Sequence, residues 1–360
     1  MKILVTGTEG YLGSLLAPLL LQQGHEVIGV DTGFYKVGWL YNGTNLTAKT
    51  LNKDIRHITA ADLEGVEAVV HMAELSNDPT GQLAPNITYE INHQGSVRLA
   101  KLAKAAGVER FVYMSSCSVY GVATEDYVTE ESPVNPQTDY AVCKTLVERD
   151  LKPMASDRFS PTFLRNATAY GASPRMRFDI VLNNLAGLAW TTNEIKMTSD
   201  GTPWRPLVHG LDICKAIICA LNADRELVHQ QVFNVGDTAH NYQVKEVAET
   251  IAEVFKGCKL SFGQSDSDNR SYRVSFEKIS QTLPGFKCDW NARKGAQQFY
   301  NLFNHIDMSA ETFKFRGFTR LKQLEYLIKT NQIDRNFFWT PHTPIVDLPE
   351  ATKEPAIALK

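Results

Sequence analysis

The chain has 360 residues, of which 43% are hydrophobic and 21% charged, and its formal net charge is −3. This is the composition of a soluble globular protein whose core is large enough to fold without disulfides, and the length allows two or three domains. The near balance of acidic and basic residues provides no cationic surface for nucleic acid. Since no apolar run approaches the roughly 18 residues of a membrane span, we expect neither a nucleic-acid partner nor a membrane association.

The cysteine pattern argues against both disulfides and a metal centre. None of the six cysteines forms a C-x-x-C pair or a cluster with histidine. The apolar run at the N-terminus is broken by Thr6-Gly7 after a few residues, which is not the pattern of a signal peptide. We therefore predict a cytoplasmic protein with free thiols and no metal site. The cysteines are Cys117, Cys143, Cys214, Cys219, Cys258 and Cys288.

The first 170 residues alternate short apolar runs with amphipathic stretches. The runs are rich in Val, Ile and Phe and several are apolar at nearly every position, which is typical of parallel strands buried on both faces. The predicted strands are Lys2–Thr6, Glu26–Val30, Ala68–Met72, Phe111–Ser115 and Thr162–Asn166. The predicted helices between them are Tyr11–Gln23, Ile87–Ala106 and Tyr140–Ala155. This alternation predicts an α/β fold with a doubly wound parallel sheet, a Rossmann fold.

Beyond residue 170 the pattern is less regular. Helices are expected at Ile180–Trp190, Leu211–Asn222 and Val244–Phe255, with short strands at Glu194–Thr198 and Gln231–Val235. Further helices are expected between Asn291 and Asn331, ending in an amphipathic run at Leu321–Ile328, and the last twenty residues read as a surface tail. The predicted organisation is a parallel-sheet domain over 1–170, to which later segments return, a smaller lobe over 171–285, and a helical extension with its tail over 286–360.

The first predicted strand leads directly into a glycine-rich turn, Gly7-x-x-Gly10-x-x-Gly13, and then into a helix. The first glycine makes a tight turn, the second lets a diphosphate approach the backbone, and the third allows the helix to pack closely on the strand. Amides at the start of the helix attract the anion. Asp31 follows the second strand, where a carboxylate accepts hydrogen bonds from ribose hydroxyls and repels a 2′-phosphate. These features predict a dinucleotide site that prefers NAD to NADP.

A second group of reactive side chains lies at the end of a later strand and on the next helix. Tyr140 and Lys144 are four residues apart at the start of a predicted helix, so both side chains can point into one cleft. A neighbouring ammonium stabilises phenolate and lowers the pKa of a phenol, which would suit Tyr140 to acid/base chemistry. Ser115 and Ser116 place hydroxyls at the carboxyl end of their strand, where ligands bind in open α/β sheets.

Together these motifs resemble the extended short-chain dehydrogenase/reductase family, and in particular its nucleotide-sugar epimerases and dehydratases. The resemblance covers roughly residues 1–285 and identifies the family more specifically than the reaction. Besides the glycine turn, Asp31 and the Tyr140–Lys144 pair, it rests on His71-Met-Ala73, Asn92, Ser116-x-x-Val-Tyr-Gly, Arg165-Asn166-Ala-Thr-Ala-Tyr-Gly171, Asn183-Asn184-Leu185, Gly201-Thr-Pro-Trp-Arg205, Val208-His209-x-x-Asp212 and Arg270-x-Tyr272.

The resemblance implies a role for each matching position. Tyr140 would be the acid/base, Lys144 would position the nicotinamide ribose, and Ser116 would hydrogen-bond the reacting sugar oxygen. Beside Tyr140 and Lys144, the implied NAD-binding residues are Gly7, Gly10, Tyr11, Leu12, Gly13, Asp31, Asp54, Ile55, Ala73, Asn92 and Ser115. The implied substrate-binding residues are Ser116, Ser118, Asn166, Asn184, Arg205 and Arg270, of which the last three would hold the diphosphate and nucleotide.

Structural roles are the alternative for several of these later residues. Asn184 could instead cap or pack locally, and Arg205 and Arg270 could form surface ion pairs. His209 and Asp212 are expected to stabilise the start of a helix and not to take part in chemistry.

The residues after the catalytic hydroxyl distinguish between possible reactions. Sugar 4,6-dehydratases of the resembled family carry an acid pair there, whereas this chain has Cys117 and Ser118, so dehydration is disfavoured. The leading prediction is an NAD-dependent epimerase of a nucleotide-linked sugar, with no net redox change. The alternatives are an NAD(P)H-dependent reductase or dehydrogenase of a 4-keto-6-deoxy sugar nucleotide, and a non-catalytic dinucleotide sensor. The resemblance also implies a homodimer that pairs helices Ile87–Ala106 and Tyr140–Ala155 in a four-helix bundle.

Overall fold

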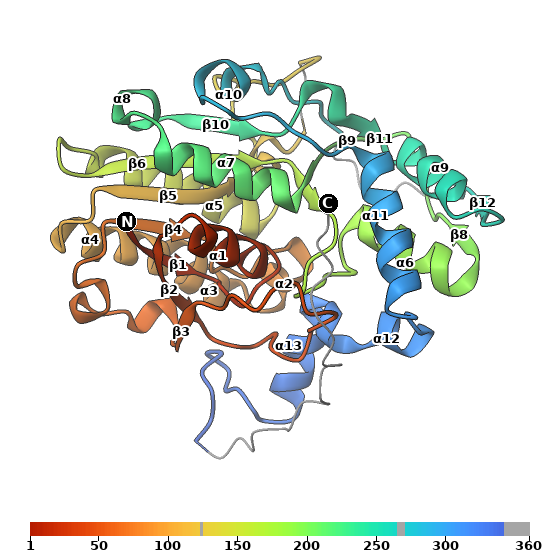
Figure 1. The fold of residues 1–360 in the computed structure, drawn as a ribbon, viewed down its shortest axis with the longest axis horizontal. Coiled ribbons are helices and arrows are strands. Elements are labelled where there is room, and N and C mark those ends of the chain that lie inside the picture. Colours follow the sequence, from red (N-terminus) through yellow and green to blue (C-terminus); the bar gives the residue numbers. More distant parts are fainter. Residues whose placement is uncertain (123–124, 265–270, 342–360) are drawn as a thin grey trace.

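A parallel sheet forms the centre of the molecule (Figure 1). The structure is a computed structural model that describes residues 1–122, 125–264 and 271–341. Within these residues the sheet has seven strands in the order β10-β6-β5-β4-β1-β2-β3. The chain steps outward from β1 to β3, crosses to β4 on the other side of β1, and continues outward to β10. The strands are β1 (Lys2–Thr6), β2 (Glu26–Asp31), β3 (Lys49–Asn52), β4 (Ala68–His71), β5 (Arg110–Ser116), β6 (Ser160–Asn166) and β10 (Val232–Val235).

Helices cover both faces of this sheet, which confirms the predicted doubly wound α/β fold. One face is covered by α1 (Gly13–Gln22) and α7 (Gly210–Asn222), the other by α4 (Ser96–Ala105) and α5 (Asp139–Leu151). The side chains of β1 alternate between the two layers, with Ile3 and Val5 packing under α1 and Leu4 on the opposite side. Since both faces are covered, all three are fully buried, which explains why the strand is apolar at successive positions.

The predicted helix Ile87–Ala106 is not one continuous α-helix. A short α3 (Pro85–Thr88) leads into π-helical turns over Tyr89–Gly95 before α4 begins. The wider turns hold Asn92 so that its side chain accepts a hydrogen bond from the N–H of Leu75 at 2.8 Å and donates one to the Leu75 carbonyl at 3.0 Å. π-helical turns of this kind are frequent at functional sites. Here they fix the segment that follows β4.

The second lobe is built from small sheets and three packed helices. Its three-stranded sheet is β11-β9-β7, and a separate pair is β12-β8. Helices α6, α9 and α11 pack on one another and bury an aromatic core that includes Phe299 and Phe303. The strands are β7 (Thr168–Tyr170), β8 (Glu194–Lys196), β9 (Trp204–His209), β11 (Asn241–Gln243) and β12 (Lys259–Ser261). The helices of this lobe are α6 (Val181–Thr192), α9 (Val244–Val254) and α11 (Ala292–His305). Shorter helices lie on connections elsewhere along the chain: α2 (Asp78–Leu83), α8 (Arg225–Val228), α10 (Glu277–Thr282) and α12 (Ala310–Lys314).

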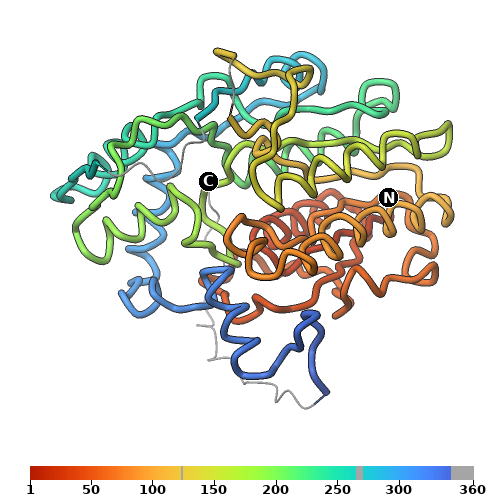
Figure 2. The backbone as a smooth tube through the Cα atoms, turned by 180° about the vertical axis from the view of Figure 1, so that it is seen from behind, coloured from red at the N-terminus to blue at the C-terminus, as the bar shows by residue number. Residues whose placement is uncertain are grey.

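The C-terminal extension divides its packing between the two parts of the molecule. Helix α11 belongs to the core of the second lobe, whereas α13 (Arg320–Lys329) runs back to the parallel-sheet domain. Leu324 and Leu327 of α13 are buried in the same core as Leu4 of β1. Figure 2 shows the last blue segments beside the red and orange N-terminal part of the chain. The expected tail lies almost wholly in residues 342–360, outside the described part of the chain.

The described residues also bear on disulfides, metal binding and membrane spans. All six cysteines are free thiols, as predicted. Within residues 1–122, 125–264 and 271–341, no group of histidine, cysteine and acidic side chains is arranged to hold a metal ion. In the same ranges, every helix is too short or too polar to cross a bilayer.

Candidate active site

A cavity of about 800 Å³ opens at the carboxyl ends of the strands. It lies where the strand order reverses between β1 and β4. Its walls come from the segments after β1, β2, β4, β5 and β6, from the second lobe, and from the start of α13. Ligands of doubly wound folds bind at this position, and the volume suits a cofactor together with part of a substrate.

The glycine turn forms one wall of the cavity. Gly7 has a φ of +76°, and a Cβ there would lie 3.2 Å from the backbone nitrogen of Ala73. At Gly13 a Cβ would lie 2.0 Å from the carbonyl oxygen of Gly7 and 2.6 Å from the Cα of Thr8. The turn can therefore pack this tightly only because these positions lack side chains. The resulting cradle of backbone amides at the start of α1 fits a dinucleotide diphosphate.

Asp31 is held at the cavity by the backbone on both sides of it. Its carboxylate accepts hydrogen bonds from the N–H of Glu9 at 3.0 Å and of Gly33 at 2.8 Å. Burial raises the pKa of Asp31, and these two hydrogen bonds oppose the rise. With one bond to each oxygen, the carboxylate retains lone pairs for the hydroxyls of a ribose.

The remaining cofactor residues predicted from the resemblance fall into two groups. Tyr11, Leu12, Asp54, Ile55 and Ala73 line the cavity, as do Gly10 and Ser115. The hydroxyl of Ser115, however, donates to Glu148 at 2.6 Å in the interior. Asn92, which was expected to bind NAD, is not among the residues that line the cavity. Its amide is fully buried and used up by the backbone of Leu75, and it acts by holding that segment in place.

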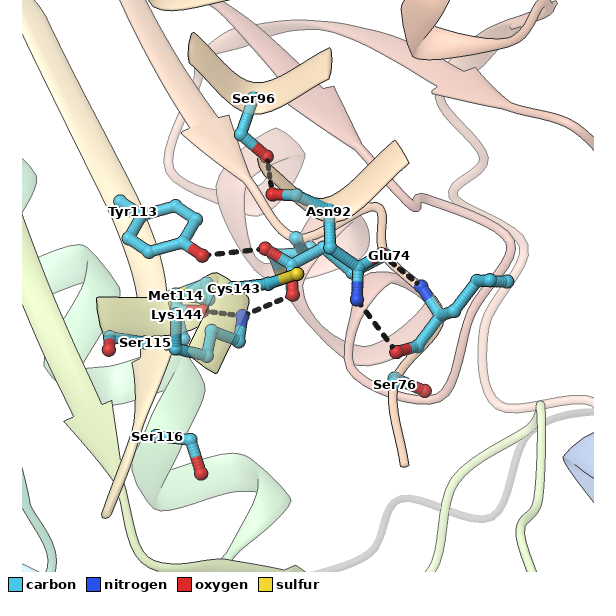
Figure 3. Close-up of polar contacts among 12 residues, drawn as sticks. Glu74, Ser76, Asn92, Ser96, Tyr113, Met114, Ser115, Ser116, Cys143 and Lys144 are labelled. Carbon is cyan, nitrogen blue, oxygen red and sulfur yellow. Dashed lines mark hydrogen bonds and ion pairs between the residues drawn. The ribbon is translucent and has the colours of Figure 1, made fainter. Parts of the chain in front are cut away.

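Lys144 and Tyr140 both line the cavity, but Lys144 has a partner that the sequence did not suggest. Its ammonium lies 2.6 Å from a carboxylate oxygen of Glu74 and also donates to the carbonyl of Met114. The other oxygen of Glu74 accepts a hydrogen bond from the hydroxyl of Tyr113 at 2.7 Å. Figure 3 shows this chain of contacts, with the Glu74 carboxylate between the Tyr113 hydroxyl and the Lys144 ammonium. The ammonium is 5.3 Å from the centre of the Tyr140 ring.

This ion pair changes the expected electrostatics of the phenol. Burial raises the pKa of Tyr140, Lys144 lowers it, and Glu74 raises it again, so that the net shift is upward. Lys144 thus lowers the pKa of Tyr140 as expected, but in the protein alone burial and Glu74 outweigh the effect of the ammonium. Burial also opposes the charge of Lys144, but Glu74 and Tyr140 together outweigh it and raise the pKa of Lys144. Lys144 is thus firmly cationic.

Polar groups also gather at the ends of β5 and β6. Ser116, Ser118 and Asn166 all line the cavity. The Oγ of Ser118 and the Oδ1 of Asn166 are buried and have no hydrogen-bond partner among the described residues. Ser116 caps the short turn after β5 by accepting from the N–H of Ser118 at 3.1 Å, and it can still donate its own proton. Buried polar atoms without partners are uncommon in folded proteins, which points to a polar ligand at this end of the cavity.

Not all of the residues predicted to bind the substrate diphosphate line the cavity. Arg205 lines the cavity, but Asn184 does not. The side-chain amide of Asn184 donates to the carbonyl of Phe178 at 3.0 Å, which favours the alternative of a local structural role over contact with the diphosphate. Arg270 lies outside the described residues, although Tyr272 of the same motif lines the cavity.

Three further side chains, those of His209, Asp212 and Cys117, have structural roles, as the sequence suggested. His209 caps α7, accepting a hydrogen bond from the N–H of Leu211 at 3.1 Å, which confirms its structural role. Asp212 accepts backbone N–H groups from the start of the extension. Cys117 is buried with its thiol directed at the carbonyl of Arg165, and burial raises its pKa, so it is not a reactive thiol.

Six charged residues of the cavity wall were missed: Glu74, Arg177, Asp179 and Arg320, and also Lys53 and Asp78. Glu74 follows Ala73 directly after a buried strand, and its position at a carboxyl strand end was the available signal. No local pattern marks Arg177, Asp179 or Arg320, because these residues come from an irregular loop and from α13. The Nε of Arg177 donates to Asp179 at 2.9 Å, which joins two of them into a buried ion pair.

Comparison with known families gives a match over most of this region. Residues 3–236 match a family model described as the NAD dependent epimerase/dehydratase family. A UDP-glucose 4-epimerase of Bacillus subtilis (strain 168) is 27% identical over 335 residues, which cover 83% of this chain and 94% of that protein. A UDP-glucose 4-epimerase of Corynebacterium glutamicum is 30% identical over 269 residues, which cover 71% of this chain and 80% of that protein.

Solved structures share the fold over nearly their whole length. The structure of MoeE5 in complex with UDP-glucuronic acid and NAD superposes with a TM-score of 0.73 at 26% identity, covering 85% of this chain and 99% of that chain. TunA, described as an NAD-dependent NDP-hexosamine 5,6-dehydratase, superposes with a TM-score of 0.75 at 23% identity over the same shares. At that identity the likeness to TunA shows the fold alone. Both comparisons leave part of the present chain unmatched.

Proposed function

The chain belongs to the NAD dependent epimerase/dehydratase family, and we propose that it is an NAD-dependent epimerase of a nucleotide-diphosphate sugar. The observation that carries the proposal is the convergence of Ser116, Tyr140 and Lys144 on the cavity that the glycine turn and Asp31 also line. The relatives named UDP-glucose 4-epimerase make UDP-hexoses the first substrates to test.

Tyr140 is the residue to which we assign proton transfer. It takes the proton of a sugar hydroxyl, while the hydroxyl of Ser116 hydrogen-bonds the same oxygen and holds it in place. When bound, the cofactor supplies an oxidised nicotinamide ring that accepts the hydride and whose positive charge favours the phenolate. The oxidised sugar then turns over within the cavity. The hydride would return to the opposite face of the same carbon while Tyr140 returns the proton to the oxygen, so that the carbon is inverted with no net redox change.

Substitution of Tyr140 tests this assignment. In Tyr140→Phe, turnover of UDP-galactose and UDP-glucose should fall by at least ~10²–10⁴-fold, because the general acid/base is lost. Bound dinucleotide, read from the absorbance of the purified protein, should remain. Tyr300→Phe is the control, since Tyr300 lies on the surface, 39% exposed, and outside the cavity. Near-normal turnover in Tyr140→Phe would contradict the proposal.

The same assays separate the epimerase from its alternatives. An epimerase regenerates its cofactor in each cycle, so it should turn over without added NAD(P)H. Stoichiometric consumption of NAD(P)H with a 4-keto-6-deoxy sugar nucleotide would identify the reductase instead. Dinucleotide binding without hydride exchange with any nucleotide sugar would identify the sensor.

We also propose that the enzyme does not dehydrate its substrate. The thiol of Cys117 donates a hydrogen bond to a backbone carbonyl in the interior, and the side chain of Ser118 has no carboxylic acid group. Neither residue can therefore protonate a leaving hydroxyl. Glu74, the carboxylate beside the catalytic pair, is committed to Lys144 and Tyr113. Product mass decides the point: an epimer keeps the mass of the substrate, whereas a product lighter by one water would establish dehydration.

For the assembly we propose a cytoplasmic homodimer formed through α4 and α5. The two helices pack on each other, and the half-buried Val97, Leu102 and Leu146 on them could be covered by the same helices of a second copy. The free cysteines agree with a reducing compartment. Sedimentation at micromolar concentration should give a dimer, and a monomer would refute this part of the proposal.

A further inference from the structure

The C-terminal extension reaches the cavity through the first residues of α13. Thr319, Arg320 and Leu321 contribute to the cavity wall, 83 residues or more beyond the end of the family match at residue 236. The side chain of Arg320 is almost completely buried, with 4% of the residue exposed. The central carbon of its guanidinium lies over the ring of Tyr35, 4.0 Å from the ring centre. The extension is therefore part of the site and not an appendage to it.

The guanidinium of Arg320 has no ion-pair partner in the described part of the chain. Among the described residues, no carboxylate oxygen lies within ion-pair distance of its guanidinium, whose recorded contact is the ring of Tyr35. The nearby carboxylate of Asp179 is already occupied. One of its oxygens accepts from the Nε of Arg177 at 2.9 Å, and the other accepts from the Asn77 amide and from the backbone N–H of Arg320, each at 3.0 Å.

Of the two buried guanidinium groups of this wall, only that of Arg177 therefore has a carboxylate within ion-pair distance among the described residues. Burial and the charge of Arg177 together lower the pKa of Arg320 to about 10, although Tyr35, Asp179 and Asp31 oppose the shift. Both effects are those of a positive charge that is removed from water and has no carboxylate at ion-pair distance among the described residues. An anionic ligand in the cavity would supply that counter-charge.

The surroundings of Arg320 indicate which ligand this is. Gln323 of α13 donates to the carbonyl of Phe34 at 3.0 Å, and Trp339 donates to the carbonyl of Thr32 at 2.7 Å. The extension is thus hydrogen-bonded to the segment that directly follows Asp31, on the β2 side of the cavity. The unpartnered hydroxyl and amide oxygens proposed to contact the sugar come from β5 and β6, on the other side of β1 and β4. The cationic wall accordingly lies toward the dinucleotide half of the cavity.

We propose that Arg320, together with Arg177, binds the diphosphate of the dinucleotide, so that the C-terminal extension completes the cofactor site. The glycine turn contributes backbone amides to the diphosphate, and the extension contributes the charge that the turn lacks. This inference rests on the dinucleotide-binding part of the proposed function and is independent of the reaction. Its expected consequence is a cofactor that dissociates slowly, since release requires a buried arginine to lose its counter-charge again.

The test measures binding of ADP, adenosine and NAD to the full chain freed of nucleotide, by titration calorimetry. In Arg320→Gln, ADP and NAD should bind roughly 10–100-fold more weakly, which is the effect of losing charged hydrogen bonds. Adenosine, which has the ribose and adenine but no phosphate, should bind within about twofold of the wild type. The matched control is Arg316→Gln: Arg316 lies on the same extension and stacks 3.7 Å from the ring centre of Tyr326, but it does not line the cavity.

Two results would overturn the inference: unchanged ADP affinity in Arg320→Gln, or an equal loss of affinity for ADP and adenosine. A second measurement avoids the variant in case it folds poorly. In the wild-type chain, amide exchange of α13 should slow on binding ADP or NAD and not on binding adenosine. Equal protection by adenosine, or none by ADP, would count against the inference. Absence of epimerase activity would affect neither measurement, so failure of the proposed reaction and failure of this inference are distinguishable.

Discussion

Replacement of Glu74 by glutamine tests the least expected feature of the site. Glu74→Gln keeps the size of the side chain and an oxygen that can accept from Tyr113, but removes the charge that lies 2.6 Å from the Lys144 ammonium. Both partners are almost completely buried, with side-chain exposures of 2% for Glu74 and 4% for Lys144. Removing one member of a buried ion pair costs about 3–5 kcal/mol, because the other charge remains without compensation. The thermal midpoint should fall by roughly 5–15 °C.

The pH dependence of turnover should change as well. Glu74 raises the pKa of Tyr140 directly and also holds the ammonium that would lower it. In Glu74→Gln the pKa of Tyr140 should therefore fall. Because the active form is the phenolate, the rise of kcat with pH should move to lower pH, by roughly one unit or more.

A control separates this effect from a general loss of stability. Glu148, one turn after Lys144 on α5, forms a comparable buried ion pair with Arg165 at 2.7 Å, and it is not among the groups with the largest effects on the pKa of Tyr140. Glu148→Gln should lose similar stability while the rise of kcat stays at its wild-type pH. If Glu74→Gln leaves the pH profile in place, or shifts it upward, the assignment of Tyr140 as a phenol controlled by Glu74 is refuted.

Three other outcomes follow from the structure. Asp31→Ser should narrow the preference for NAD over NADP, measured as the ratio of the two dissociation constants, because the carboxylate that repels a 2′-phosphate is removed. Gly13→Ala should abolish dinucleotide binding or soluble expression, since its Cβ would lie 2.0 Å from the carbonyl oxygen of Gly7. Burial raises the pKa of Asp212 to about 6 in the fold. Because the pKa of this acid is higher in the folded state, the protein loses stability as the pH rises from the unfolded-state pKa near 4 to about 6. The free energy of unfolding in urea should therefore be lower at pH 7.5 than at pH 4.5 by about 2–3 kcal/mol, and this difference should be absent in Asp212→Asn.

Local patterns were sufficient wherever a single element carries the information. The glycine spacing, Asp31 at the end of β2, and Tyr140 and Lys144 one turn apart on α5 each lie within a few residues of one another. Their geometry follows from backbone sterics and helix periodicity. The same reasoning placed His209 correctly as a helix cap.

Residues whose role depends on a distant partner were predicted less well. Asn92 and Asn184 matched the family pattern, yet both amides are taken up by nearby backbone and neither lines the cavity. A motif identifies the side chain but not the competing hydrogen bonds around it. Whether an amide faces a ligand or a carbonyl depends on which backbone segment the fold brings beside it.

By itself, then, the sequence determined the doubly wound sheet, the glycine turn and the placing of Tyr140 and Lys144 one helical turn apart, because strand burial, glycine packing and helix spacing are short-range properties of the chain. Only the tertiary structure decided the charge state around that pair and the extent of the cofactor site. Glu74 meets Lys144 across 70 residues of sequence, and Arg320 reaches the wall beside Asp31 from the far end of the described chain. Electrostatic interactions depend on separation in space and on burial, and neither can be read from separation along the chain.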